Sequence, residues 1–239
     1  MSAEPMRVQA TAPRGSRYLW LSFVGPFALY WILTQVPPLY PDYYAWTYPA
    51  VVILAGAGTV ALLYGRQILR PHRHVAAGVA AGLVGIALWI FLSHLQLERY
   101  LSALLPEALQ PKGRVAFDPF TSIANPGARW AFVGFRLVGL VLVVPIAEEL
   151  FWRGFLLRWL ISPNWQEQRL GQFSGFSFAG VVVVFTLAHP EWLAAAVYCA
   201  LLNGLIYWKR DLWTCVVAHG VSNLVLAIYI LSTQHWELW

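Results

Sequence analysis

The sequence predicts an all-α integral membrane protein, a polytopic bundle of about seven to eight membrane helices. Of its 239 residues, 59% are hydrophobic and only 11% are charged, and the mean hydropathy is +0.58. Soluble domains carry roughly 25% charged residues, so this chain lacks the charge to cover a surface that faces water. Its apolar residues also fall into runs close to the roughly 20 residues that a helix needs to cross a bilayer. The length suits one compact domain.

The first half of the chain supplies membrane spans. Residues 1–17 are polar and basic, and we expect a disordered cytoplasmic tail there, followed by one integral membrane domain over 18–239. The apolar run Tyr18–Val36 is long for a signal peptide and has no clear cleavage site after it, so we expect a retained span that ends at Pro37-Pro38. Further spans are predicted over Tyr48–Tyr64 and Val75–Leu97.

A polar interval separates these spans from the second half of the chain. Residues 98–129 combine mixed charge with several prolines, which predicts an external loop with some interfacial helix. The residue before a proline avoids the helical region, so a helix is expected to begin at Pro190 with Glu191 in its first turn. We expect the functional core over about 130–231, in four apolar segments: Arg136–Leu160, Ser174–Ala188, Glu191–Trp208 and Leu212–Leu231.

The net charge of +5 does not indicate nucleic-acid binding, because the basic residues are scattered through short loops. The tail, the loop that carries Arg66, Arg70 and Arg73, and the later basic loops all fall on one side of the predicted bundle. By the positive-inside rule that side is cytoplasmic, with the amino terminus inside and the carboxyl terminus outside. We therefore expect a multi-pass protein surrounded by lipid, in the bacterial cytoplasmic (inner) membrane.

Two arginines bracket the longest apolar segment of the chain. Arg136 and Arg158 are separated by about 33 Å if the residues between them form an α-helix. We expect both side chains to snorkel to opposite interfaces. This arrangement would place Glu148 close to the midplane of the membrane.

An acidic pair lies at the centre of that segment. Residues four apart stack on one helix face, so Glu149 is expected beside Arg153, while Glu148 points about 100° away. Glu149 and Arg153 can neutralise each other, which leaves Glu148 to face a cavity and act as a general base. The alternative is a structural salt bridge with a spare glutamate bonded to a neighbouring helix.

Two histidines complete the polar residues of the apolar segments. His219 and Asn223 share a helix face, and two such donors could converge on a developing oxyanion; the alternative is hydrogen bonding between helices. Phe185 is expected to pack below His189. The apolar segment before His189 is short, which predicts that the His189-Pro190 turn is sunk below the outer surface, near the level of Glu148.

Taken together, these motifs resemble the CAAX-protease and bacteriocin-processing (CPBP, Abi-type) family of intramembrane endopeptidases. The resemblance covers about residues 144–226 and includes the flanking text Phe151-Trp-Arg-Gly and Asn203-Gly-Leu-Ile-Tyr. The size and topology further resemble members of that family associated with exosortase sorting systems. Pro190 directly after His189, and Trp152 in place of a smaller aromatic residue, depart from the family pattern. The ordered set is Glu148-Glu149-x-x-x-Arg153, Phe185-x-x-x-His189 and His219-x-x-x-Asn223.

The resemblance implies an endopeptidase of the glutamate type that hydrolyses peptide bonds near the membrane. In it, Glu148 and His189 would activate a water, His219 and Asn223 would hold the oxyanion, and Glu149 with Arg153 would order the acidic helix. The substrate would be a peptide or protein, lipidated or with a hydrophobic carboxyl terminus. The alternatives are a non-catalytic membrane binding protein, such as a bacteriocin-immunity or surface-protein assembly factor, and a small proton-coupled transporter.

We expect no cofactor. Zinc held by Glu148, His189 and His219 is the minority alternative, but the sequence has no HExxH motif and the three side chains come from separate helices. Cys199 and Cys215 lie in apolar segments without paired spacing, which predicts small buried core residues rather than a disulfide or a metal site.

Overall fold

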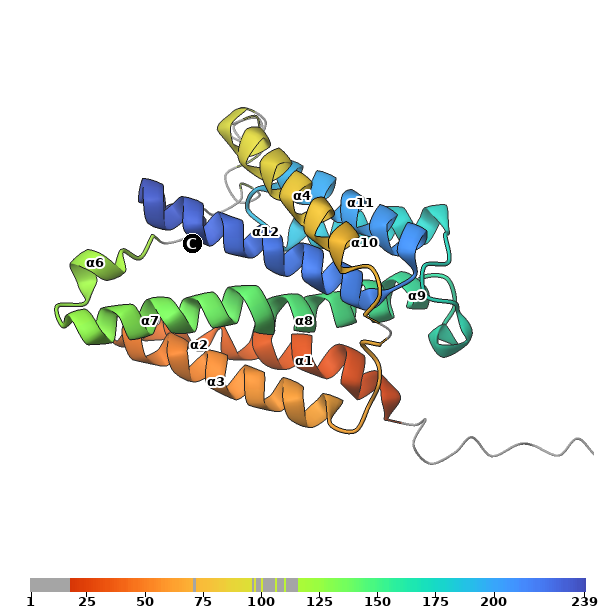
Figure 1. Ribbon diagram of the computed structural model, residues 1–239, viewed down its shortest axis with the longest axis horizontal. Helices are drawn as coiled ribbons and strands as arrows, with labels where there is room; N and C mark the ends of the chain where they lie inside the picture. Colours follow the sequence, from red (N-terminus) through yellow and green to blue (C-terminus); the bar gives the residue numbers. More distant parts are fainter. Residues whose placement is uncertain are drawn as a thin grey trace, which may run out of the picture.

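The computed structural model describes residues 18–70, 72–95, 97, 100, 106, 110 and 116–239, and all regular secondary structure within them is helical (Figure 1). Five helices in this part of the chain are long and apolar enough to cross a membrane. The predicted class, a helical membrane bundle, is confirmed. The expected tail over 1–17 and most of the expected loop up to residue 115 lie outside the described residues.

The first three spans follow the predicted order. Helix α1 covers Leu19–Leu33 and α3 covers Tyr44–Leu63; the two pack side by side, and α4 (Val75–Leu95) crosses the bundle at a steep angle (Figure 1). Pro37 and Pro38 do not end the apolar segment as expected. They lie in the short helix α2 (Val36–Leu39), where prolines in the first turn cost no hydrogen bond.

The acidic pair lies on one long helix, Pro126–Trp159, which crosses the whole molecule (Figure 1). It begins ten residues earlier than Arg136, where the predicted segment starts. The side chain of Asn125 caps it by accepting a hydrogen bond from the Ala128 amide at 3.0 Å, and Pro126 occupies its first turn. Its parts are α7 (Pro126–Val138), η3 (Gly139–Val143), α8 (Val144–Glu149), η4 (Leu150–Leu156) and α9 (Leu157–Trp159).

Three further helices carry the histidines and their neighbours. They are α10 (Gly175–Leu187), α11 (Trp192–Lys209) and α12 (Leu212–Thr233), with the short helices α6 (Pro119–Ser122), η5 (Trp165–Glu167) and η6 (Trp236–Leu238) between and after the spans. Helix α11 begins at Trp192 with Glu191 at its N-cap, not at Pro190 as predicted. The Asp211 side chain caps α12 at the Trp213 amide and also accepts from the amide of Arg73, which ties the loop before α4 to the start of α12.

Helix α12 is held by close contacts of backbone with backbone. A Cβ added at Gly82 of α4 would lie 2.5 Å from the carbonyl oxygen of Ala218, and one at Gly220 would lie 2.8 Å from that of Val141. The hydroxyl of Ser222 donates to the Gly82 carbonyl at 2.9 Å. Small residues at helix crossings are typical of membrane bundles, where close approach replaces the hydrophobic effect between helices.

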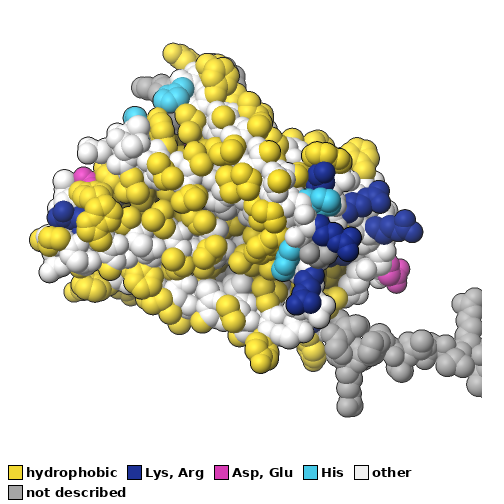
Figure 2. All heavy atoms as spheres, viewed as in Figure 1, with side chains coloured by type: hydrophobic (Ala, Val, Ile, Leu, Met, Phe, Trp, Pro, Cys, Tyr) yellow, Lys and Arg dark blue, Asp and Glu magenta, His cyan; other side chains and the backbone are white. Residues whose placement is uncertain are grey.

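Most of the Lys and Arg side chains visible in Figure 2 gather at one end of the molecule, near α9 and the connection from α3 to α4. The rest of that face is largely hydrophobic. This separation of basic from apolar surface is the pattern on which the orientation prediction depends. The side that faces the cytoplasm stays a prediction.

We expect Gly82→Ala to lower the free energy of unfolding by about 1–3 kcal/mol, because the added methyl group would overlap the Ala218 backbone. Thermal unfolding of the detergent-solubilised protein measures the effect. Gly204→Ala is the matched control, since its methyl group meets nothing within 4 Å and alanine favours the helix. Equal unfolding temperatures for the two variants would contradict the close α4–α12 contact.

Candidate active site

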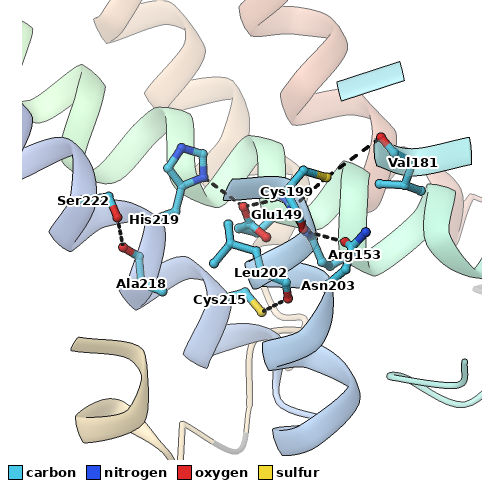
Figure 3. Close-up of polar contacts among 10 residues, drawn as sticks. All are labelled: Glu149, Arg153, Val181, Cys199, Leu202, Asn203, Cys215, Ala218, His219 and Ser222. Atoms are coloured by element: carbon cyan, nitrogen blue, oxygen red, sulfur yellow. Dashed lines mark hydrogen bonds and ion pairs between the residues drawn. The ribbon is translucent and has the colours of Figure 1, made fainter. Parts of the chain in front are cut away.

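A buried carboxylate joins two of the predicted motifs. Glu149 and Arg153 are fully buried and lie 3.0 Å apart, as their spacing predicts. The same Oε1 atom of Glu149 also accepts a hydrogen bond from Nδ1 of His219 on α12, at 2.8 Å (Figure 3). Glu149 therefore orients the imidazole as well as the acidic helix, a role that its sequence position does not reveal.

Arg153 extends this network to a third helix. Its Nε donates to Oδ1 of Asn203 at 3.2 Å, and one terminal nitrogen donates to the Cys199 carbonyl at 3.3 Å, both on α11. Its guanidinium also lies over the ring of Phe185, 5.3 Å from the centroid. Cys199 and Cys215 are free and buried, as predicted. Paired in this way, the buried charges avoid the cost of ions isolated from water.

Glu148 faces away from this network and lines a cavity of about 340 Å³. Its Oε2 atom is buried and forms no hydrogen bond with the described residues. The predicted division between a paired Glu149 and a cavity-facing Glu148 is therefore present. The other lining residues come from seven helices of the bundle, the short helix α2 and the carboxyl-terminal segment: Tyr30, Thr34, Pro37, Pro38, Tyr44, Tyr48, Ile86, Trp89, Arg136, Leu140, Val144, Phe185, His189, Tyr198, His219, Ser222, Asn223, Leu226, Leu238 and Trp239.

His189 reaches the same cavity from the end of α10. Its ring stacks on Phe185, as predicted, with the centroids 4.4 Å apart. Its Nδ1 lies 2.8 Å from the Phe185 carbonyl, which can only accept a hydrogen bond. In the neutral ring the proton is therefore on Nδ1 and the lone pair on Nε2. This is the tautomer of an imidazole that accepts a proton at Nε2.

His219 and Asn223 also line the cavity, but each is held by a separate contact with the long helix. Nδ1 of His219 is bonded to Glu149, and the carboxamide nitrogen of Asn223 donates to the Leu140 carbonyl at 2.8 Å. Nε2 of His219 and the second amide hydrogen of Asn223 are left for a ligand, and Nε2 donates a hydrogen bond only when the ring is protonated. The structure thus brings Glu148, His189, His219 and Asn223 to one cavity, with Glu149 and Arg153 directly behind it.

Comparison with known families identifies the part of the chain that carries this site. Residues 130–225 match the family model for type II CAAX prenyl endopeptidase, Rce1-like. This segment belongs to the CAAX-protease family. The resemblance seen in the motifs is confirmed over these residues, which include all six candidate site residues. No curated protein and no solved structure matches the chain.

The acidic pair of the Rce1-like segment sits in an irregular helix. Helix α8 holds both glutamates in six residues of α-helix, between the π-helical turns η3 and η4. π-Turns interrupt the regular hydrogen-bond ladder and occur frequently at functional sites. The Leu140 carbonyl that receives Asn223 lies in η3, and Arg153 lies in η4. Apolar periodicity gives no sign of either turn.

The prediction that Arg136 snorkels to an interface is wrong. Its side chain is only 7% exposed, donates to the Tyr44 hydroxyl at 2.8 Å and lies over the Tyr48 ring, 4.4 Å from the centroid. The reason is that the helix begins at Pro126, so Arg136 lies within the span and lines the cavity of the Rce1-like segment. Arg158 packs at the other end of the helix, against the rings of Phe23 and Trp165.

The described residues contain no group of three or more His, Cys, Asp or Glu side chains arranged to hold a metal ion. The zinc set of Glu148, His189 and His219 is therefore not assembled as a ligand cluster. Nδ1 of His219 is engaged with Glu149 and Nδ1 of His189 with the Phe185 carbonyl, which leaves Nε2 of each ring as the nitrogen that a metal ion could contact. Metal dependence stays a prediction that experiment decides.

Glu149→Gln should destabilise the protein strongly, because it leaves the Arg153 guanidinium buried without its counterion. Breaking a buried pair in this way costs about 3–5 kcal/mol. Thermal unfolding in detergent measures the loss. Glu148→Gln is the matched control: its Oε2 has no hydrogen bond to lose, so its unfolding temperature should stay near that of the wild type. Similar losses for both variants would contradict the division between the glutamates.

Proposed function

We propose that this protein is an intramembrane endopeptidase of the glutamate type, which uses water held between Glu148 and His189. The observation that carries the proposal is the meeting of four polar side chains, from two helical spans and a connecting turn, in one cavity. The family match supports peptide or protein hydrolysis in a membrane setting. Glu148 lines the cavity, and its Oε2 atom forms no hydrogen bond with the described residues, so it is available to a water there.

The proposed reaction begins with attack by water. Glu148 or Nε2 of His189 removes one proton as the water oxygen adds to the carbonyl carbon of the scissile bond. The carbonyl oxygen becomes an oxyanion in a tetrahedral intermediate. Collapse of this intermediate breaks the carbon–nitrogen bond, and the proton passes from Glu148 or His189 to the leaving amine. The products are a carboxylic acid and an amine.

The oxyanion is held by His219 and Asn223 in this proposal. With Nδ1–H donated to Glu149, a protonated His219 presents Nε2–H to the cavity. Asn223 presents the amide hydrogen that Leu140 does not use. Donors fixed in place before the reaction stabilise the developing charge without reorganisation. Glu149 and Arg153 act behind them as positioning residues.

The walls of the cavity support a hydrophobic substrate. Seven of the 21 lining residues are Phe, Trp or Tyr, among them Tyr30, Trp89, Phe185 and Tyr198. We infer cleavage of peptide bonds near the membrane, close to a lipidated or hydrophobic carboxyl terminus. We also infer residence in a bacterial cytoplasmic membrane with the amino terminus inside. A role beside exosortase sorting systems is the biological setting that the sequence suggests.

Glu148→Gln should lower cleavage by at least about 10²-fold while the protein still inserts and folds, because an amide cannot accept the proton from water. Mass spectrometry of the mature carboxyl termini of membrane and surface proteins, in cells carrying each variant, measures cleavage. Glu167→Gln is the matched control, since Glu167 is exposed in η5 and lies outside the cavity. Undiminished cleavage by Glu148→Gln at normal protein levels would refute the role of this glutamate.

Removal of metal ions should leave turnover unchanged, because water activation is assigned to Glu148 and His189 alone. The purified protein is assayed on a prenylated peptide before and after exhaustive treatment with EDTA and 1,10-phenanthroline. Loss of activity that Zn²⁺ restores would contradict the proposal. That result would point to Glu148, His189 and His219 as ligands.

A further inference from the structure

Basic side chains gather in three loops at one end of the molecule (Figure 2). The loops are the connection from α3 to α4, the connection from α9 to α10 and the turn between α11 and α12. Six cations lie in or beside them, five exposed and one half-buried, and none forms an ion pair with any of the described residues. The proposed mechanism gives them no role. We refer to these six side chains as the basic surface: Arg66, Arg70, Arg73, Arg169, Lys209 and Arg210.

The three loops contact one another although they are far apart in the sequence. The amide of Arg73 donates to Oδ2 of Asp211 at 2.9 Å, which joins the first loop to the turn before α12. A Cβ added at Gly171 would lie 3.0 Å from Cγ of Arg210, so the second loop packs on the same turn. The basic surface is therefore assembled from all three loops, with Arg73 and Arg210 where they meet.

Acidic side chains leave the basic surface largely without counter-charge. Asp211 is only 2% exposed, and its carboxylate accepts from two backbone amides and from the Thr214 hydroxyl. Among the described residues of these loops, Glu167 in η5 is the one exposed acid. Positive charge is thus concentrated at this end of the spans. At their opposite ends lie Asp42, Asp118, Glu191 and Glu237.

Exposed aromatic side chains place the basic surface at the depth of the lipid headgroups. Tyr64 follows the last residue of α3 and is 85% exposed, and Trp208 in the last turn of α11 is 71% exposed. Nζ of Lys209 lies 3.4 Å from the centroid of the Trp208 ring. Tyrosine and tryptophan in such positions mark the boundary between lipid and water in membrane proteins. Cations beside them lie level with the phosphate groups of the membrane.

We propose that the basic surface binds anionic phospholipids through their phosphate groups, with Arg73 and Arg210 at its centre. This inference goes beyond the proposed function and does not depend on it. A guanidinium binds a phosphate through two parallel hydrogen bonds, and an anionic lipid supplies the negative charge that these loops lack. An acidic protein would offer the same charge. The lipid is favoured because the cations adjoin interfacial aromatic rings and a largely hydrophobic face (Figure 2).

The test measures lipid binding to the whole protein in a neutral detergent by native mass spectrometry. The wild type should bind phosphatidylglycerol at least about tenfold more tightly than phosphatidylcholine, whose choline group cancels the phosphate charge. The double variant Arg73→Gln/Arg210→Gln should bring this ratio close to one. Arg73→Lys/Arg210→Lys, which keeps both charges but not the two-pronged geometry, should give an intermediate ratio. Arg129→Gln is the matched control, because Arg129 lies in α7 at the opposite end of the long helix, and it should leave the ratio unchanged.

A second variant, Arg66→Gln/Arg70→Gln, removes two exposed cations from the same surface and should lower the ratio as well. Equal affinity of the wild type for the two lipids would overturn the inference, and so would a full preference retained by both glutamine double variants. Tight binding of polyglutamate that phosphatidylglycerol does not displace would assign the surface to an acidic protein partner and overturn it too. No step of the test requires cleavage of a peptide, so failure of the peptidase proposal would leave its result unaffected.

Discussion

The carboxylate of Glu149 has no access to water, and it accepts hydrogen bonds from Arg153 at 3.0 Å and from His219 at 2.8 Å. Arg153 in turn donates to Asn203 and to the Cys199 carbonyl. One buried acid thus links the long helix 126–159 to α11 and α12. Because the surrounding medium cannot solvate charge, removing any one of these groups would leave a buried partner without its counter-charge or its hydrogen bond. The orientation of His219 in the cavity depends on this constraint.

The same constraint separates structural charges from those that we assign to function. Glu149 and Arg153 are neutralised within the protein, and they order the helices. Glu148 and Arg136 lie on the same helix and face the cavity, where Glu148 keeps a buried oxygen without a hydrogen bond and Arg136 has no ion pair among the described residues. We assign Glu148 to the activation of water in the proposed reaction. The Asn223 side chain donates to the Leu140 carbonyl in the π-turn η3, and Leu140 lies between Arg136 and Glu148 along the helix.

Spacing within one helix was predicted well from the sequence. The i,i+4 relation placed Glu149 beside Arg153 and Phe185 beneath His189, because these contacts depend only on the local backbone. The membrane class was also predicted correctly, because it depends on composition and not on which helices meet. The start of the long helix is predicted ten residues too late, at Arg136, although Asn125-Pro126 is a recognisable cap, because apolar residues alone do not mark it. That error put Arg136 at an interface and hid its place in the cavity.

The sequence by itself determined that the chain forms apolar helices and that ionisable residues lie within them at helical spacings. It also placed both glutamates, both histidines and Asn223 in a segment of the CAAX-protease family. Tertiary structure decided which of these groups meet. Glu149 and His219 are 70 residues apart in sequence, and Arg136 and Tyr44 are 92 apart, so no local period relates them. Their contacts arise from helix crossings such as that of α4 with α12, set by which backbones can approach closely.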